Sequence, residues 1–169
     1  VTGKFETPSA DLRWYNAAFD RAGNTFSLDS FSYRPAMNID TFLAVQSYQK
    51  DYTKAGSGRL QMGPVDIGRF IDDSLLIISK VKADQVYLFD YKDRNLPFNS
   101  GLIKPLPVNF LKQIPVKFRV DSLVLTNASV DYTEVSEKTK IAGNVPVKRM
   151  QVALANVKNF GAVPGDSLR

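Results

Sequence analysis

The chain has 169 residues, of which 44% are hydrophobic and 23% are charged, and this size and composition are typical of a single globular domain. It contains no cysteine and no histidine, which excludes zinc sites built from Cys and His, cysteine nucleophiles and Ser-His-Asp triads. The net charge of +5 fits an anionic partner and equally an ordinary protein surface. Composition leaves carboxylate, lysine or tyrosine catalysis and an all-oxygen metal site open. We rank an enzyme last and expect a non-enzymatic protein with no catalytic residues, no cofactor and no metal.

The sequence has no apolar run near the ~20 residues that cross a bilayer, and its first residues do not read as a signal peptide. Its last residues complete no predicted element. We expect a fragment of a longer protein, from which any anchor or signal has been removed.

Apolar residues alternate with polar ones along much of the chain, and this period of two predicts β-strands. The predicted strands cover residues 12–19, 26–33, 75–91, 117–135 and 145–157. Two short helices are predicted, one at 39–52 with Asp40 as its N-cap and one at 108–114 between prolines. The fold class that follows is all-β and mainly antiparallel, with residues 1–169 as a single segment of a longer repeat protein.

An eight-residue pattern, here called the octad, occurs five times, at residues 26–33, 60–67, 76–83, 118–125 and 145–152. Its first, third, sixth and eighth residues are apolar, and its central pair, the fourth and fifth residues, is polar or small. The spacing between octads is irregular, so the chain is not a solenoid with a fixed period.

The central pair of the octad predicts bent strands. Because side chains alternate between the two faces of a strand, Phe118 and Leu123 would lie on opposite faces of a straight strand. A bulge or bend at Asp121 and Ser122 would restore them to one face. Such bends in several strands would curl an elongated sheet and make its apolar face concave. The alternative is a β-sandwich, in which the octad residues pack against a second sheet.

Two octads are followed by similar segments. Asp84-Gln85 follows the octad at 76–83, and Thr126-Asn127 follows the octad at 118–125; a strand-like run with a tyrosine comes after each. Two polar residues between two strands are typical of a hairpin turn, so each unit is predicted to fold back on itself as an antiparallel hairpin.

Residues 71–98, the KPLP at 104–107, and residues 118–139 and 147–160 together resemble AsmA-like, TamB-related bacterial envelope proteins of the Bacteroidetes type. This resemblance is one of repeated strand patterns and it covers most of the chain. It implies a long periplasmic protein, anchored in the inner membrane by an N-terminal helix, with a grooved β-sheet that serves lipid transport to the outer membrane. The family supplies no catalytic residues.

The resemblance implies that octad residues line a hydrophobic groove for acyl chains. The candidate groove residues are Leu28, Phe31, Ile78, Val81, Val120, Leu123, Met150 and Val152. Phosphate head groups would meet basic residues at the open edge of the groove, and the candidates are Lys80, Lys82, Lys117 and Arg119. The alternative function is that of a cell-surface adhesion or carbohydrate-binding β-sandwich module.

The expected partner is a lipid or membrane, reached through the full-length protein. Nucleic acid is not expected as a partner, because Asp84, Asp90 and Asp93 weaken the positive field around the aromatic residues of 87–91. Unpaired sheet edges at the two ends of the fragment would favour an artificial edge-to-edge self-association.

Overall fold

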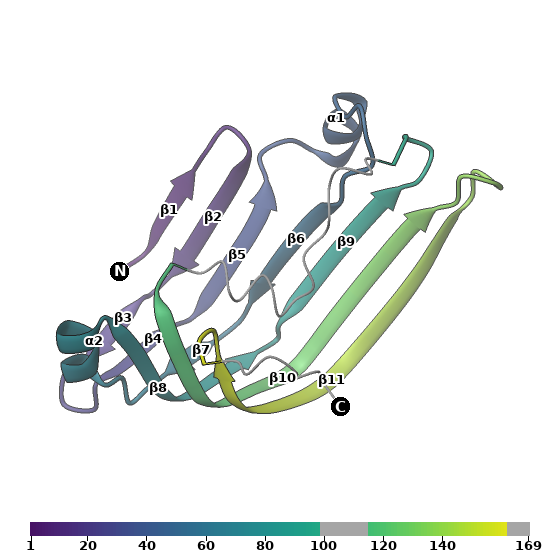
Figure 1. Ribbon diagram of the computed structural model, residues 1–169. Coiled ribbons are helices and arrows are strands. Elements are labelled where there is room, and N and C mark those ends of the chain that lie inside the picture. The colour runs from purple at the N-terminus through teal and green to yellow at the C-terminus, as the bar shows by residue number, and fades with distance from the viewer. Residues whose placement is uncertain (99–114, 162–169) are drawn as a thin grey trace.

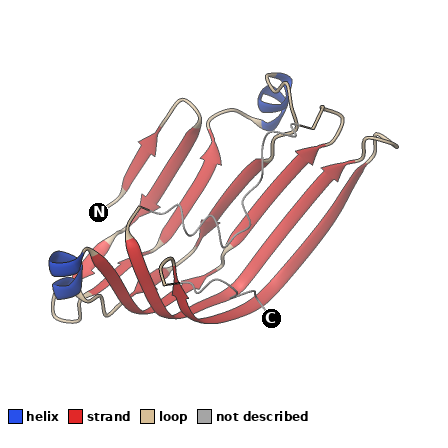
Figure 2. Cartoon of the chain, in the orientation of Figure 1, coloured by secondary structure: helices blue, strands red, loops and turns tan. Residues whose placement is uncertain are grey.

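The computed structural model describes residues 1–98 and 115–161 of the chain. These residues form one large β-sheet with two short helices, and the sheet is not closed into a barrel (Figures 1 and 2). The prediction of an all-β, elongated and curled sheet is confirmed. The described strands all belong to this single sheet, so they do not form the alternative β-sandwich.

Eleven strands make up the described part of the sheet. They are β1 (Gly3–Glu6), β2 (Ala10–Tyr15), β3 (Ala18–Asp20), β4 (Thr25–Leu28), β5 (Ser30–Pro35), β6 (Tyr52–Ser57), β7 (Leu60–Met62), β8 (Leu75–Asp84), β9 (Tyr87–Asp93), β10 (Lys117–Val135) and β11 (Ala142–Lys158). The predicted strands at 12–19, 26–33 and 75–91 are each divided in two, and β1 and β6 were not predicted.

The divided strands are halves of longer, bent strands. β6 and β7 pair with β9 and β8 in one unbroken register, because Gly56 is opposite Tyr87 and Leu60 is opposite Ala83. The pairs β2–β3 and β5–β4 continue one another in the same way. The sheet therefore consists of six long strands, of which β11 forms one edge, and β1 is added at the other edge.

Two lines of bends cross these long strands. We call the one nearer the curled end the first bend line and the other the second bend line. The first passes through Gly63-Pro64, Ser79-Lys80, Asp121-Ser122 and Asn156, and the second through Asn16, Asp29-Ser30, Gly58, Gln85, Asn127 and Arg149. Several of these residues have a left-handed backbone, with φ of 50° at Asn127 and 55° at Asn156. The central pair of each octad lies on one of the two lines.

The predicted hairpins at Asp84-Gln85 and Thr126-Asn127 are wrong. Strand β10 is continuous, and it pairs in parallel with β8 along its first half and with β9 along its second half. Each paired residue of β10 lies opposite the residue 42 positions earlier in the chain, so the two similar segments found in the sequence lie side by side. A single left-handed residue, Gln85 or Asn127, bends a strand that continues forward, and the register shifts at this point only between β10 and β11.

Two short helices cap the ends of long strands. Helix α1 (Ile39–Ala44) is shorter than the predicted 39–52, and its N-cap is Asn38, whose side chain accepts the Thr41 N–H, instead of Asp40. Helix α2 (Ile67–Asp73) was not predicted; it begins at the last residue of the octad at 60–67. The predicted helix at 108–114 lies outside the described residues.

The core of the described sheet lies at its curled end, where β8, β10 and β11 bend over in Figure 1. Val65, Ile78 and Val120 are buried there and form one cluster. Six further hydrophobic residues pack against it, namely Met62, Leu76, Val81, Phe118, Leu123 and Val157. The core formed by the described residues is small, because the single described sheet buries a cluster of side chains only where it bends over.

Candidate functional site: the apolar concave face

Four rows of cross-strand partners consist entirely of hydrophobic residues, and because partners in a ladder share a face, each row lies on one side of the sheet. From the curled end, the rows are Val65, Ile78, Val120 and Val157; Phe19, Phe26, Met62, Val81, Leu123 and Leu154; Leu28, Leu60, Ala83, Leu125 and Val152; and Leu12, Tyr33, Ala55, Leu88, Val130 and Val147. We call the face that these rows form the concave face, and the opposite one the outer face.

The bends keep all four rows on this one face. At the first bend line, Phe118 and Leu123 both pack against Val120, so the predicted return of the octad residues to one face is found. The ladder between β10 and β11 does not slip at this point, because Val120 faces Val157 and Ser122 faces Ala155. The return is therefore made by a bend of the strand and not by a register shift.

At the second bend line, two hydrogen bonds show that the apolar residues before and after the bend also lie on one face. The Thr126 hydroxyl and the Asn127 amide both donate to Oδ1 of Asp84, at 2.6 and 2.8 Å. These consecutive side chains therefore lie on the same face, which places Leu125 and Ala128 together on the other. The register between β10 and β11 shifts here, between Leu125 and Val130. The two donated hydrogen bonds lower the pKa of Asp84 below its usual value.

All eight candidate groove residues lie on the concave face. Six of them belong to the four rows: Ile78 and Val120, Val81 and Leu123, and Leu28 and Val152. Phe31 and Met150 lie at the second bend line, where Phe31 is opposite Trp14 and Met150 is opposite Ala128. Leu28, Ile78 and Val120 are buried, and the other five are half-buried. The structure brings Ile78, Val81, Val120 and Leu123 into one cluster and distributes the others over the same face.

Several exposed apolar residues of this face were missed by the sequence analysis. Val145, Val147 and Leu154 of β11 are 59%, 42% and 50% exposed, and Leu88 of β9 is 38% exposed. The alternation of apolar and polar residues along 145–157 already indicated that the apolar residues of this strand share a face, but only Met150 and Val152 were chosen as candidates. Left-handed residues at Arg149 and Asn156 keep the apolar side chains of β11 on one side.

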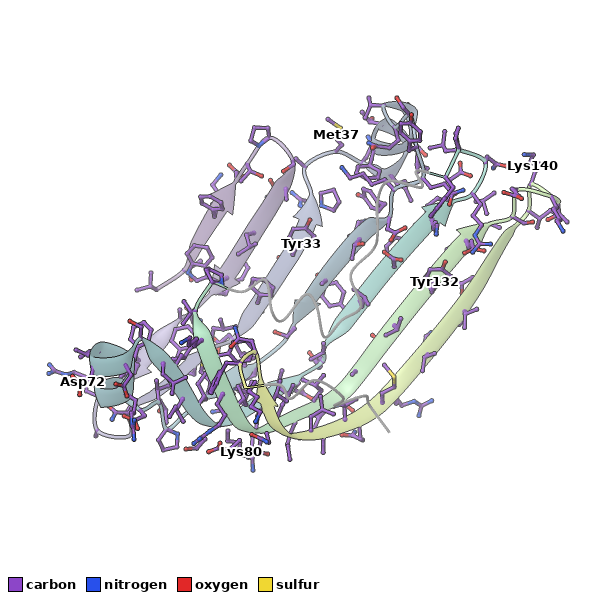
Figure 3. All side chains as sticks on the ribbon, viewed as in Figure 1. Tyr33, Met37, Asp72, Lys80, Tyr132 and Lys140 are labelled. Atoms are coloured by element: carbon purple, nitrogen blue, oxygen red, sulfur yellow. The ribbon has the colours of Figure 1, made fainter. Side chains whose placement is uncertain are left out.

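The concave face becomes polar at the end opposite the curled core. The Tyr132 hydroxyl donates to Oε2 of Glu134 at 2.5 Å, and Arg94 forms an ion pair with the same carboxylate at 3.1 Å (Figure 3). Partial burial, and then the hydrogen bond to Glu134, raise the pKa of Tyr132 to about 12. In the same region the Thr53 hydroxyl donates to Asp90 at 2.6 Å. The face is thus apolar along most of its length, with a hydrogen-bonded polar group at one end.

The outer face carries charged side chains together with aromatic ones. Arg34 pairs with Asp11, and Lys54 lies over the rings of Tyr52 and Phe89. Lys80 and Lys82 are also on this face, because they flank Val81 along β8. The expectation that these two lysines meet head groups at the edge of the apolar groove is therefore wrong, since the sheet itself separates them from the groove residues.

Nothing in the described ranges forms a group of three acidic side chains that could hold a metal ion. Neither α1 nor α2, the helices of the described chain, is long and apolar enough to cross a membrane. Comparison with protein-family models, with curated proteins and with solved structures found no match to this chain.

Proposed function

We propose that this chain is a non-enzymatic segment of a periplasmic, inner-membrane-anchored envelope protein, and that its concave face binds the acyl chains of lipids during outer-membrane biogenesis. The observation that carries the proposal is the set of four apolar rows on one face of a single sheet. The periplasmic setting and the transport role rest on the sequence resemblance to AsmA-like proteins.

The dimensions of the face suit an acyl chain. A row that crosses six strands is about 24 Å long, because neighbouring strands are about 4.8 Å apart. One acyl chain fills about half of the ~30 Å hydrocarbon core of a bilayer, or about 15 Å. A whole chain therefore fits along one row. A single polar group at one end of the face would leave the head group in water.

The energetics also favour an apolar ligand. Each buried methylene contributes about 0.8 kcal/mol, so ten buried methylenes contribute about 8 kcal/mol before the entropy of association is subtracted. No polar contact is needed for useful binding. Valine and leucine side chains that are about half exposed, such as Val145 and Leu154, are the surface on which this energy would be gained.

The proposal is tested by lipid extraction with a matched pair of variants. The purified chain is incubated with phospholipid vesicles, recovered, and the bound phospholipid is measured by mass spectrometry. Leu154→Asp places a charge on the concave face, and Ala153→Asp places the same charge on the outer face of the same strand. We expect Leu154→Asp to lose most of the bound lipid and Ala153→Asp to retain it. Equal loss in both variants, or no bound lipid in the unmodified chain, would contradict the proposal.

A further inference from the structure

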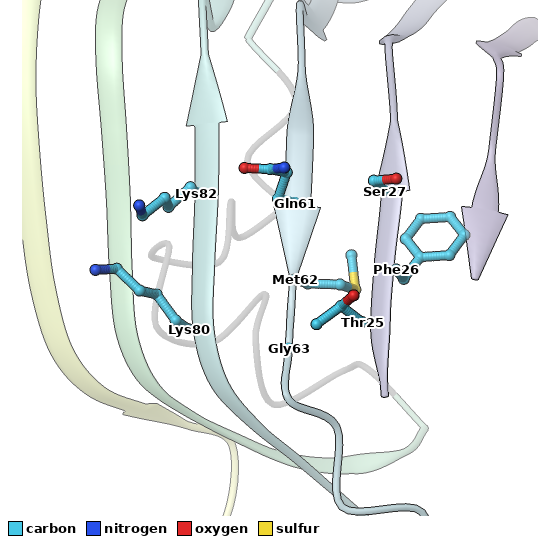
Figure 4. Close-up of a pocket in the computed structure, with 8 residues that line it drawn as sticks. All are labelled: Thr25, Phe26, Ser27, Gln61, Met62, Gly63, Lys80 and Lys82. Carbon is cyan, nitrogen blue, oxygen red and sulfur yellow. The ribbon is translucent and has the colours of Figure 1, made fainter. Parts of the chain in front are cut away.

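The outer face contains a cavity that the apolar groove does not use. It has a volume of about 260 Å³ and lies over strands β4, β7 and β8 (Figure 4). Its lining residues are Thr25, Phe26, Ser27, Gln61, Met62, Gly63, Lys80 and Lys82. The volume corresponds to several water molecules of about 30 Å³ and falls below the about 300 Å³ at which drug-sized pockets begin. It therefore suits one small polar group.

The polar side chains of this cavity have no partners in the part of the chain that the structure describes. Thr25, Ser27, Gln61, Lys80 and Lys82 form no side-chain hydrogen bond or ion pair within residues 1–98 and 115–161. Together they offer two ammonium groups, two hydroxyls and one amide, all of which donate hydrogen bonds. Gln61 is opposite both Ser27 and Lys82 in the ladder, so three of these donors lie in one row across adjacent strands.

Acidic residues that neighbour the cavity in the ladder are already engaged, and Asp121, next to the ladder partner of Lys80, forms an ion pair with Arg119. Asp20, which is opposite Thr25, accepts the N–H groups of Ala22 and Gly23 at 3.1 Å. Asp84, two residues beyond Lys82, accepts from Thr126 and Asn127. Neither carboxylate forms an ion pair with Lys80 or Lys82 within the described chain. The two lysines therefore leave an excess of positive charge at the cavity.

We propose that this cavity is a binding site for a phosphate group, either free or as the ester of a small head group. The two ammonium groups would neutralise the anion, and the hydroxyls of Thr25 and Ser27 and the amide of Gln61 would donate to its oxygens. The site is independent of the proposed lipid groove, because it lies on the opposite face of the sheet.

The test is an NMR titration of the folded chain with inorganic phosphate and, separately, with glycerol 3-phosphate, at constant ionic strength. Lys80→Gln/Lys82→Gln removes the two charges of the site. Lys138→Gln/Lys140→Gln makes the same change of net charge in the turn between β10 and β11, at the far end of the sheet (Figure 3). All four lysines are exposed, so both variants are expected to fold.

We expect saturable chemical-shift changes at the amides of Ser27, Gln61 and Lys82. The dissociation constant should rise about tenfold or more in Lys80→Gln/Lys82→Gln. It should change little in Lys138→Gln/Lys140→Gln. Tighter binding of glycerol 3-phosphate than of phosphate would identify a head group as the ligand, and equal binding would identify the free anion. Shifts spread over all lysines, equal weakening in both variants, or no saturable shift would overturn the proposal.

Discussion

Val81 and Leu123 occupy the same position in two different octads, and they are direct partners in the parallel ladder between β8 and β10. Residues 76–93 and 118–135, which are similar in sequence, are thus also neighbours in the sheet. Equivalent residues lie side by side, bend at the same two lines and present the same apolar face. Both residues also pack against the cluster of Val65, Ile78 and Val120, so one contact links the repeat to the core.

The left-handed backbone at Asn127 predicts a specific order of stabilities. Asn127→Val should lower the free energy of unfolding by about 1–2 kcal/mol more than Asn127→Gly, because a β-branched residue is strained at a φ of 50° and glycine is not. Both variants lose the 2.8 Å hydrogen bond to Asp84, so the difference between them isolates the backbone. Urea unfolding measures it. Equal stabilities would mean that the bulge at the second bend line is not formed.

The carboxylate of Asp84 predicts that the stability of the fold decreases at low pH. Its pKa is lowered by hydrogen bonds from Thr126 and then Asn127, so its contribution to stability is present above the unfolded value of 3.8 and is lost as the pH falls through the lower folded value. A carboxyl titration by NMR should give a midpoint for Asp84 below 3.8. In Thr126→Val the midpoint should rise. An unchanged midpoint would show that the Thr126 hydroxyl does not reach the carboxylate.

Because the core is small, truncation of one core side chain should cause a large loss of stability. Ile78 is 6% exposed and lies in the cluster with Val65 and Val120, so Ile78→Ala should lower the free energy of unfolding by about 2–5 kcal/mol. Ile141 is 69% exposed in the turn after β10, and Ile141→Ala should change the free energy of unfolding by about 0.5 kcal/mol or less. Chemical denaturation of both variants checks this. Similar effects at the two positions would mean that the curled end is not a packed core.

The phenol of Tyr132 predicts a loss of stability in alkali. Its pKa is about 12 in the folded chain and 10 without structure, so the unfolded state ionises first as the pH rises. The free energy of unfolding should therefore fall between pH 10 and 12 in the unmodified chain relative to Tyr132→Phe. Urea unfolding of the two proteins over this range measures the difference. Parallel curves would contradict the hydrogen bond to Glu134.

The octad made the bends of the sheet predictable. The pattern of apolar and polar residues required a change of face at each central pair, and in the structure the central pairs 29–30, 63–64, 79–80, 121–122 and 148–149 all lie on one of the two bend lines. The same alternation placed the eight candidate residues on one face. Local periodicity was sufficient here, because the face of a strand residue depends on its near neighbours in sequence.

The direction of the chain after each octad was not predictable from the same pattern. A polar pair such as Asp84-Gln85 is compatible with a hairpin turn and with a bulge, since both use a left-handed residue. The choice depends on which strands lie on either side. β10 has β8 and β9 on one side and β11 on the other, so it has no free edge on which to fold back. Those partners are distant in sequence, and periodicity carries no information about them.

The central claim, that lipid acyl chains lie on the concave face, is tested most directly by photo-crosslinking in cells that express the full-length protein. A photoreactive residue replaces Val81 or Leu154 on the concave face, or its neighbour Lys82 or Ala153 on the outer face of the same strand. We predict phospholipid adducts at Val81 and Leu154 and none at Lys82 and Ala153, as detected by mass spectrometry. Adducts at all four positions, or protein adducts alone at Val81 and Leu154 in a folded protein, would contradict the claim.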